Sequence, residues 1–138
     1  MVRAETYQSG IMELLMSKVQ DYVKLIKLRL SLLVVFSSLM GYLYASAGSV
    51  DWTVFIGLSF GGFFITAASN AFNQVYEVDI DGVMERTKNR PIPAGRMNVA
   101  EGMISGVIMG LLGFYILFKL TNPACAIMGA LALLSYVF

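Results

Sequence analysis

The stretch that decides the fold is Asn70–Arg96, which reads NAFNQVYEVDIDGVMERTKNRPIPAGR at the end of a long apolar run. Asn73, Glu77 and Asp81 recur at intervals of four residues, so a helix would carry them on one face, here called the polar stripe. Their oxygens suit a hard cation, and Mg²⁺ commonly takes only one or two protein carboxylates and completes its shell with water and substrate phosphate. We therefore predict that these three residues are catalytic and bind Mg²⁺. Asp79 would face away, because it lies about 200° from Glu77 around a helix.

A cluster of basic residues follows the polar stripe. Arg86, Lys88 and Arg90 lie within nine residues of its last member. Arginine can bind a phosphate group through two parallel hydrogen bonds. We predict that a diphosphate lies between the cation and this cluster. Arg86 and Arg90 would be catalytic, because they would stabilise the charge on a diphosphate leaving group. The predicted substrate-binding residues are Asn70, Arg86, Lys88, Arg90 and Arg29.

A solvated cytoplasmic loop is the ordinary alternative for charged residues beside a membrane helix, and a basic cluster there often only sets orientation. That explanation suits the arginines as well as a phosphate site does. It does not account for the polar stripe, because acidic residues contribute little to orientation. Acidic side chains that approach an apolar run at helical spacing are also costly. The stripe therefore favours a functional site.

Composition places the chain among membrane proteins. Its 138 residues are 57% hydrophobic and 14% charged, with a mean hydropathy of +0.70. These values predict an all-α membrane protein, a helical bundle with several spans. The net charge of +1 implies no nucleic-acid partner. The chain has no histidine and a single cysteine, Cys125, so histidine-based zinc sites, histidine haem ligands and internal disulfides are excluded from these residues.

Apolar runs divide the chain into spans and connections. We predict a cytoplasmic, partly amphipathic segment over residues 1–29, which would lie on the membrane surface, followed by a transmembrane domain over 30–138. Full spans are predicted at about 30–47, 52–73 and 99–118, with a catalytic loop at 74–97. The last run, 123–138, is shorter than the roughly 20 residues that cross a bilayer. We therefore expect the sequence to stop within a fourth span.

Lysine and arginine set the predicted orientation. Nine of the ten lie in the N-terminal segment and in the 74–97 loop. Both segments therefore belong in the cytoplasm, joined by an even number of spans, most simply in the inner (plasma) membrane of a bacterial cell. Lys27 and Arg29 stand just before the first span. They would either extend to the membrane interface, which is the commoner behaviour, or face a substrate phosphate.

The spacing of the polar stripe resembles the first acid-rich motif of the intramembrane aromatic prenyltransferases. Within that superfamily, the whole Asn70–Arg96 string is similar to the protoheme IX farnesyltransferase branch, the haem O synthases. The similarity includes Asn-x-x-Asn at its start, Met84-Glu85-Arg86-Thr87, Arg90-Pro91 and Gly95-Arg96. The segment 21–29 also resembles the opening of that branch, with Lys27-Leu28-Arg29 where Lys-Pro-Arg is typical.

This resemblance implies a larger bundle, of which the chain holds the first three spans and part of a fourth. It implies Mg²⁺-dependent transfer of a farnesyl group from farnesyl diphosphate to a vinyl group of haem B, with water adding a hydroxyl, to give haem O. It also suggests coupling to haem A synthase or to terminal oxidase assembly. Members of the branch carry a second acid-containing motif and histidines that these residues lack. We therefore expect the 138 residues alone to be inactive.

Two other functions remain open from the sequence. One is a related enzyme that prenylates a quinone or chlorin precursor, which the mass of the product would distinguish. The other is a non-catalytic membrane assembly subunit, complete at this length, which would bind no diphosphate. A purely structural subunit gives no reason for the acids and amide of the polar stripe.

Overall fold

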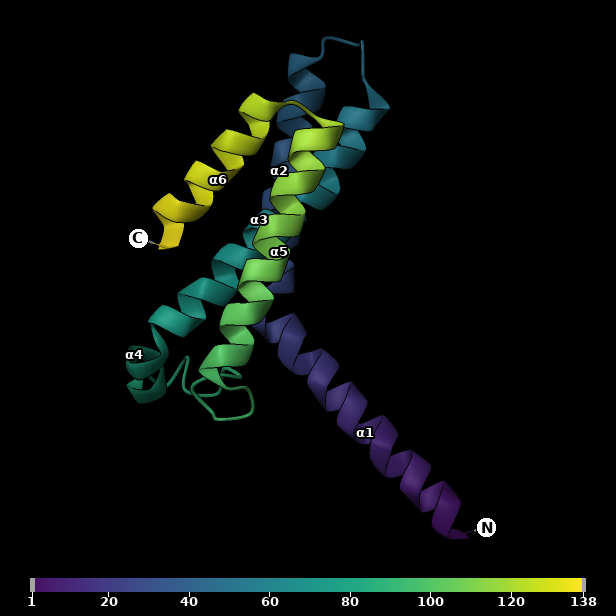
Figure 1. Cartoon of the computed structure of the whole chain (residues 1–138), viewed down its shortest axis with the longest axis vertical. Helices are drawn as coiled ribbons and strands as arrows, with labels where there is room; N and C mark the ends of the chain where they lie inside the picture. The colour runs from purple at the N-terminus through teal and green to yellow at the C-terminus, as the bar shows by residue number, and fades with distance from the viewer. Residues whose placement is uncertain (1, 138) are drawn as a thin grey trace.

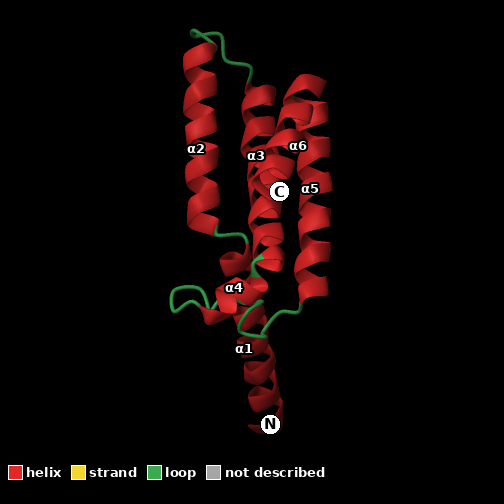
Figure 2. Ribbon diagram, turned by 90° about the vertical axis from the view of Figure 1, so that its left-hand side faces the viewer, coloured by secondary structure: helices red, strands yellow, loops and turns green. Residues whose placement is uncertain are grey.

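A computed structural model describes residues 2–137 as a bundle of membrane helices with one helix projecting from it (Figures 1 and 2). The element order is α1 (Val2–Leu25), α2 (Leu28–Ala45), α3 (Trp52–Tyr76), α4 (Val78–Val83), α5 (Val99–Leu120) and α6 (Pro123–Val137). No strand occurs among residues 2–137. The all-α prediction is therefore confirmed.

Three helices, α2, α3 and α5, are long and apolar enough to cross a membrane. They correspond to the three predicted full spans, although α2 begins two residues before the predicted start and α3 extends three residues beyond its predicted end. Helix α6 is apolar but has only 15 residues. In an apolar solvent a helix satisfies its backbone hydrogen bonds internally, so such runs have little alternative to helix.

Local sequence signals define the helix ends. Asp51 begins α3, where its Oδ1 accepts hydrogen bonds from the backbone N–H groups of Thr53 and Val54. Asn98 begins α5, where its Oδ1 accepts from the N–H of Glu101 at 2.6 Å, the capping arrangement expected from the sequence. Pro123 opens α6, a position that requires no backbone N–H.

Helix α3 is the centre of the bundle, and α5 packs along it (Figure 1). Their approach depends on glycine. A Cβ added at Gly113 of α5 would lie 2.9 Å from the backbone nitrogen of Ile65. Buried residues form one cluster at mid-bundle around Ile65 and Leu117, and another at the loop end around Val75 and Met97. The loop-end cluster packs beneath the polar stripe and fixes that end of α3.

Helix α1 leaves the bundle at the end that also carries α4 and the 84–97 loop (Figures 1 and 2). The two basic segments of the sequence therefore lie at the same end of the molecule. Helix α1 is exposed over most of its length, and only its last turns contact the bundle. The opposite end carries the short connections α2–α3 and α5–α6.

Candidate functional site

The polar stripe crosses a break between two helices. Helix α3 ends at Tyr76, and Glu77 stands between it and α4 with φ −96° and ψ 11°. The four-residue spacing survives the break, because Glu77 donates its N–H to Asn73 O at 3.0 Å and Asp81 donates to Glu77 O at 2.7 Å. Side chains follow the same spacing: Asn73 Nδ2 donates to Glu77 Oε2 at 2.9 Å. The stripe is thus continuous.

Asp81 is the buried member of the stripe, with 3% of its surface exposed. Its Oδ2 accepts a hydrogen bond from Arg90 Nη1 at 2.8 Å, in an ion pair that folds the loop back onto α4. Thr87, itself buried, donates its hydroxyl to Asp81 O at 2.9 Å. A buried carboxylate is stable only with such partners. The structure therefore joins the predicted metal residues to one of the predicted phosphate-binding arginines.

The other predicted basic residues stand apart from the stripe. Arg86 is exposed and makes no hydrogen bond or ion pair within residues 2–137. Lys88 pairs with Glu85 at 2.9 Å on the exposed side of the loop. Arg29 is exposed at the start of α2 and lines a separate shallow cavity. Asp79 is exposed, on the side of α4 away from Asp81, as the helical spacing predicted. Of the predicted basic residues, only Arg90 is joined to the stripe by a side-chain hydrogen bond within residues 2–137.

Lys27, for which the sequence favoured the membrane interface over a substrate phosphate, stands near the polar stripe. It is half-buried in the short link between α1 and α2. Burial lowers the pKa of its ammonium group below the ordinary value, and the positive charge of Arg90 lowers it further, while Glu77 and Asp81 act in the opposite direction. Its ammonium group is therefore close enough to interact with the charges of the stripe. The only signal in the sequence was its place just before a span.

Lys27 reaches this position through a sharp break in the chain. Its φ of 49° lies in the left-handed region, which ends α1 and starts α2 in a new direction. Two buried amides of α3 hold the break. Asn70 Nδ2 donates to Ile26 O at 2.9 Å and to Ser31 Oγ at 3.1 Å. Gln74 Nε2 donates to the last carbonyls of α1 at 3.2 and 3.3 Å. Asn70, predicted to bind substrate, thus positions the backbone around Lys27.

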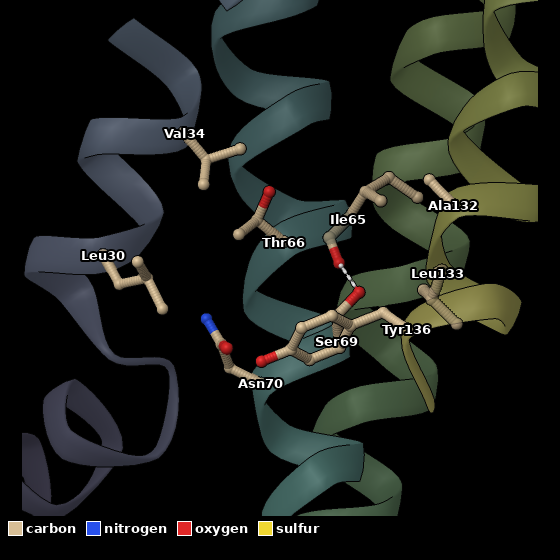
Figure 3. Close-up of a pocket in the computed structure, with 9 residues that line it drawn as sticks. All are labelled: Leu30, Val34, Ile65, Thr66, Ser69, Asn70, Ala132, Leu133 and Tyr136. Atoms are coloured by element: carbon tan, nitrogen blue, oxygen red, sulfur yellow. Dashed lines mark hydrogen bonds between the residues drawn. The ribbon is translucent and has the colours of Figure 1, made fainter. Parts of the chain in front are cut away.

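An apolar cavity of about 280 Å³ begins beside Asn70 and runs between α2, α3 and α6 (Figure 3). Tyr136 of α6 points its hydroxyl group toward the side chain of Asn70 (Figure 3). The cavity lies about one helical turn along α3 from Asn73. It is lined by Leu30, Val34, Ile65, Thr66, Ser69, Asn70, Ala132, Leu133 and Tyr136. An apolar ligand with a charged head at the stripe would find its tail on this side of the bundle.

The donor set of the stripe is compatible with Mg²⁺. Residues 2–137 contain no group of three or more acidic, cysteine or histidine side chains placed to hold a metal. The stripe instead offers two carboxylates and one amide, and Mg²⁺ commonly uses so few protein carboxylates when water and phosphate complete its shell. Asp81 Oδ2 is already bonded to Arg90, so Oδ1 is the oxygen that remains for a cation. The residues fit a cation shared with a diphosphate better than a site built by protein alone.

Comparison with known proteins identifies the family of the chain. The family model of the UbiA prenyltransferase family matches residues 34–138. Protoheme IX farnesyltransferase of Christiangramia forsetii is 40% identical over 121 residues, covering 88% of this chain and 40% of that protein. The protein of the same name from Flavobacterium psychrophilum is 41% identical over 118 residues, covering 84% and 39%. That from Cytophaga hutchinsonii is 38% identical over 122 residues, covering 88% and 43%.

The chain spans about two fifths of the length of the curated relatives it matches. No solved structure matches it. The family match begins within α2, at Val34. It includes the rest of α2, all of α3 and α5, the polar stripe and the loop. With three apolar helices and a family match over most of its length, this chain is an integral membrane protein and belongs to the UbiA prenyltransferase family.

Proposed function

We propose that this chain binds a prenyl diphosphate at the polar stripe and forms the donor side of a prenyltransferase. The observation that carries the proposal is the contact between Asp81 and Arg90, because it brings a cation-binding carboxylate and a phosphate-binding guanidinium to one point. Arg90 uses one of its five N–H donors on Asp81 Oδ2 in this contact, which leaves others for a phosphate oxygen. Lys27 adds a further positive charge near the stripe.

Mg²⁺ bound at Asn73, Glu77 and Asp81 would neutralise part of the charge on the diphosphate. The residues of the chain supply the rest of the proposed chemistry. Arg90 and Lys27 hold the diphosphate, and Arg86, which is exposed and free to turn, closes over it. As the carbon–oxygen bond of the donor breaks, its electron pair goes to the diphosphate, and these cations stabilise that charge. The apolar cavity beside Asn70 receives the prenyl tail.

We further propose farnesyl diphosphate as the donor and haem B as the acceptor, with haem O as product. The names of the relatives support this choice. The farnesyl carbocation left by ionisation would take the electron pair of a haem vinyl group, forming the new carbon–carbon bond. Water would then add to the resulting cation and lose a proton, giving the hydroxyl group. Coupling to haem A synthase or to terminal oxidase assembly is part of the same proposal.

Orientation and membrane belong to the proposal as well. The basic segments at one end of the bundle support a cytoplasmic N-terminus and a cytoplasmic loop, with the chain in the inner membrane of a bacterial cell. Soluble diphosphates would then reach the stripe from the cytoplasm. We propose that these 138 residues by themselves bind the donor without turning it over.

Calorimetric titration of the 138-residue chain in lipid nanodiscs tests the donor site. Farnesyl diphosphate is expected to bind with Mg²⁺ present and to bind much more weakly in excess EDTA. Farnesol, which has the tail without the diphosphate, and inorganic diphosphate, which has no tail, are the matched controls and are expected to bind more weakly than the whole donor. If farnesyl diphosphate binds no better than farnesol with Mg²⁺ present, the proposed function is wrong.

The acceptor is tested by product mass. Membranes of cells that express the gene of this sequence would receive farnesyl diphosphate with haem B, a quinone precursor or a chlorin precursor. Haem carrying both a farnesyl and a hydroxyl group is the expected product. If a prenylated quinone or chlorin forms instead, the proposed acceptor is wrong and the chain belongs to another branch of the family.

A further inference from the structure

Helix α1 is joined to the 84–97 loop by an ion pair whose carboxylate is buried. Asp21 lies in the last turns of α1 and is 5% exposed, although its helix is otherwise largely in the open. Its Oδ1 accepts a hydrogen bond from Arg96 Nε at 2.9 Å. The two residues are 75 positions apart in the sequence. A carboxylate buried to this extent needs its partner, because removing one member leaves an uncompensated charge.

Arg96 also binds the backbone of the loop itself. Its Nη2 donates to Asn89 O at 2.6 Å, while its Nε is bonded to Asp21. Gly95 has a φ of 82°, so the chain turns back just before the guanidinium. Met97 then donates its N–H to Pro91 O at 3.1 Å, which closes the turn. One planar side chain therefore connects α1 to the peptide group at Asn89.

The peptide group that Arg96 holds is adjacent to Arg90. Arg90 in turn donates to Asp81 Oδ2 at 2.8 Å. The contacts thus run from Asp21 through Arg96 and the Asn89 carbonyl to Arg90 and the polar stripe. Arg96 spans its two acceptors because a guanidinium presents donors in a rigid fork, whereas a lysine ammonium is a single point on a flexible stem.

We propose that Asp21 and Arg96 are positioning residues, which fix the loop so that Arg90 is held ready for the diphosphate. This inference rests on the proposed donor site and deepens it. Helix α1 then has a defined role, because its last turns hold the loop in place through the Asp21–Arg96 ion pair. The pair acts through Arg90 and touches no reacting atom.

A second ion pair on the same helix provides a matched control. Lys18 Nζ lies 2.7 Å from Glu101 Oε1 at the start of α5, and Tyr22 donates to the same oxygen at 2.9 Å. This pair is more exposed than Asp21, and the side-chain hydrogen bonds of Lys18 and Glu101 within residues 2–137 join them to each other and to Tyr22 rather than to the 84–97 loop. Replacing Lys18 therefore removes one contact between α1 and the bundle and keeps the Asp21–Arg96 ion pair.

The test compares Asp21→Asn, Arg96→Lys and Lys18→Met in the 138-residue chain in nanodiscs. Asp21→Asn keeps the size of the side chain without its charge, and Arg96→Lys keeps the charge without the fork. Each is expected to weaken Mg²⁺-dependent binding of farnesyl diphosphate about tenfold. Lys18→Met is expected to stay within about twofold of the unchanged chain. Hydrogen exchange of the 84–97 amides is expected to rise in the first two variants and not in the third.

A double-mutant cycle shows whether the pair acts through Arg90. In an Arg90→Ala background, Asp21→Asn is expected to cause no further loss of affinity, because the group it positions is gone. The same loss in both backgrounds would overturn the inference. Unchanged loop exchange in Asp21→Asn and Arg96→Lys would overturn it too, whatever the ligand does. If the unchanged chain fails to bind farnesyl diphosphate, the proposed donor site is wrong. Hydrogen exchange of the loop amides then still shows whether the Asp21–Arg96 pair fixes the loop.

Discussion

Asp79 and Asp81 stand two residues apart on α4 in opposite surroundings. Asp81 is buried against Arg90, whereas Asp79 is exposed. Asp81→Asn removes a carboxylate charge from the proposed cation site and is expected to weaken Mg²⁺-dependent binding of farnesyl diphosphate at least about tenfold. Asp79→Asn is expected to change it by less than about twofold, because exposed substitutions rarely matter more. Calorimetry on both variants measures the difference, and turnover of the intact enzyme should follow the same order. Equal losses of affinity in the two variants would contradict the proposal that the polar stripe binds the cation.

Lys27 combines a functional charge with an unfavourable backbone conformation. Lys27→Gly removes the ammonium group and is expected to lower affinity for inorganic diphosphate with Mg²⁺ on the order of tenfold. Lys27→Arg keeps the charge and should retain most of the affinity. The affinity should also fall as pH rises through the lowered pKa of Lys27, because the neutral amine no longer attracts the diphosphate. Titration of the three proteins over a pH series measures both effects. A pH dependence that persists in Lys27→Arg would assign it to another group.

Replacing Lys27 with glycine or with alanine separates the effect of the backbone conformation from the effect of the charge. Both substitutions remove the ammonium group, but only glycine adopts a φ of 49° without strain. The folded chain with Lys27→Gly is therefore expected to be more stable than that with Lys27→Ala by about 1 kcal/mol. Thermal unfolding in one detergent provides the comparison. The two variants should bind diphosphate equally weakly, and a large difference between them would mean that the link moves when lysine is removed.

At the scale of the helices, the contact between α3 and α5 depends on how closely their backbones approach. Gly113→Ala would place a methyl group 2.9 Å from the nitrogen of Ile65, and such overpacking costs about 1–3 kcal/mol. Gly110 provides the control on the same helix, since a Cβ there would lie 3.6 Å from its nearest neighbours. Gly110→Ala is expected to be neutral or stabilising, because alanine favours helix over glycine. Thermal unfolding that fails to separate the variants would disprove the close contact.

Two amides on α3 decide how the first span meets the site. Asn70 and Gln74 are one turn apart and hold the α1–α2 break from its two sides. Gln74 donates to the carbonyls of Lys24 and Leu25 at the end of α1, and Asn70 donates to Ile26 O in the link and to Ser31 Oγ of α2. Buried amides inside an apolar bundle are costly without partners. Their bonds fix the angle at which α1 leaves and thereby place Asp21 against Arg96. The end of α3 therefore connects three features: the α1–α2 break at Lys27, the Asp21–Arg96 ion pair and the polar stripe.

Nine of the ten lysines and arginines lie in residues 1–29 and in the 84–97 loop, and these two segments meet at one end of the molecule, which predicts its orientation in a membrane (Figures 1 and 2). Single cysteines in a Cys125→Ala background test it with an impermeant maleimide on intact cells. Ser49→Cys, in the α2–α3 connection, is expected to react from outside. Ser9→Cys in α1 and Glu85→Cys in the loop should react only after the membrane is opened. Labelling of either of the last two in intact cells would reverse the proposed orientation.

The sequence by itself determined the helices and the face that carries the site. Apolar runs must form helices in lipid, and a four-residue period places Asn73, Glu77 and Asp81 together, because both rules act within one segment. The tertiary structure alone decided that Arg90 rather than Arg86 meets Asp81, that Lys27 joins the site, and that Asp21 is bonded to Arg96. Each of these contacts depends on a chain reversal or on the left-handed link at Lys27. Local periodicity carries no information on contacts between residues tens of positions apart, since those are selected by the packing of whole helices.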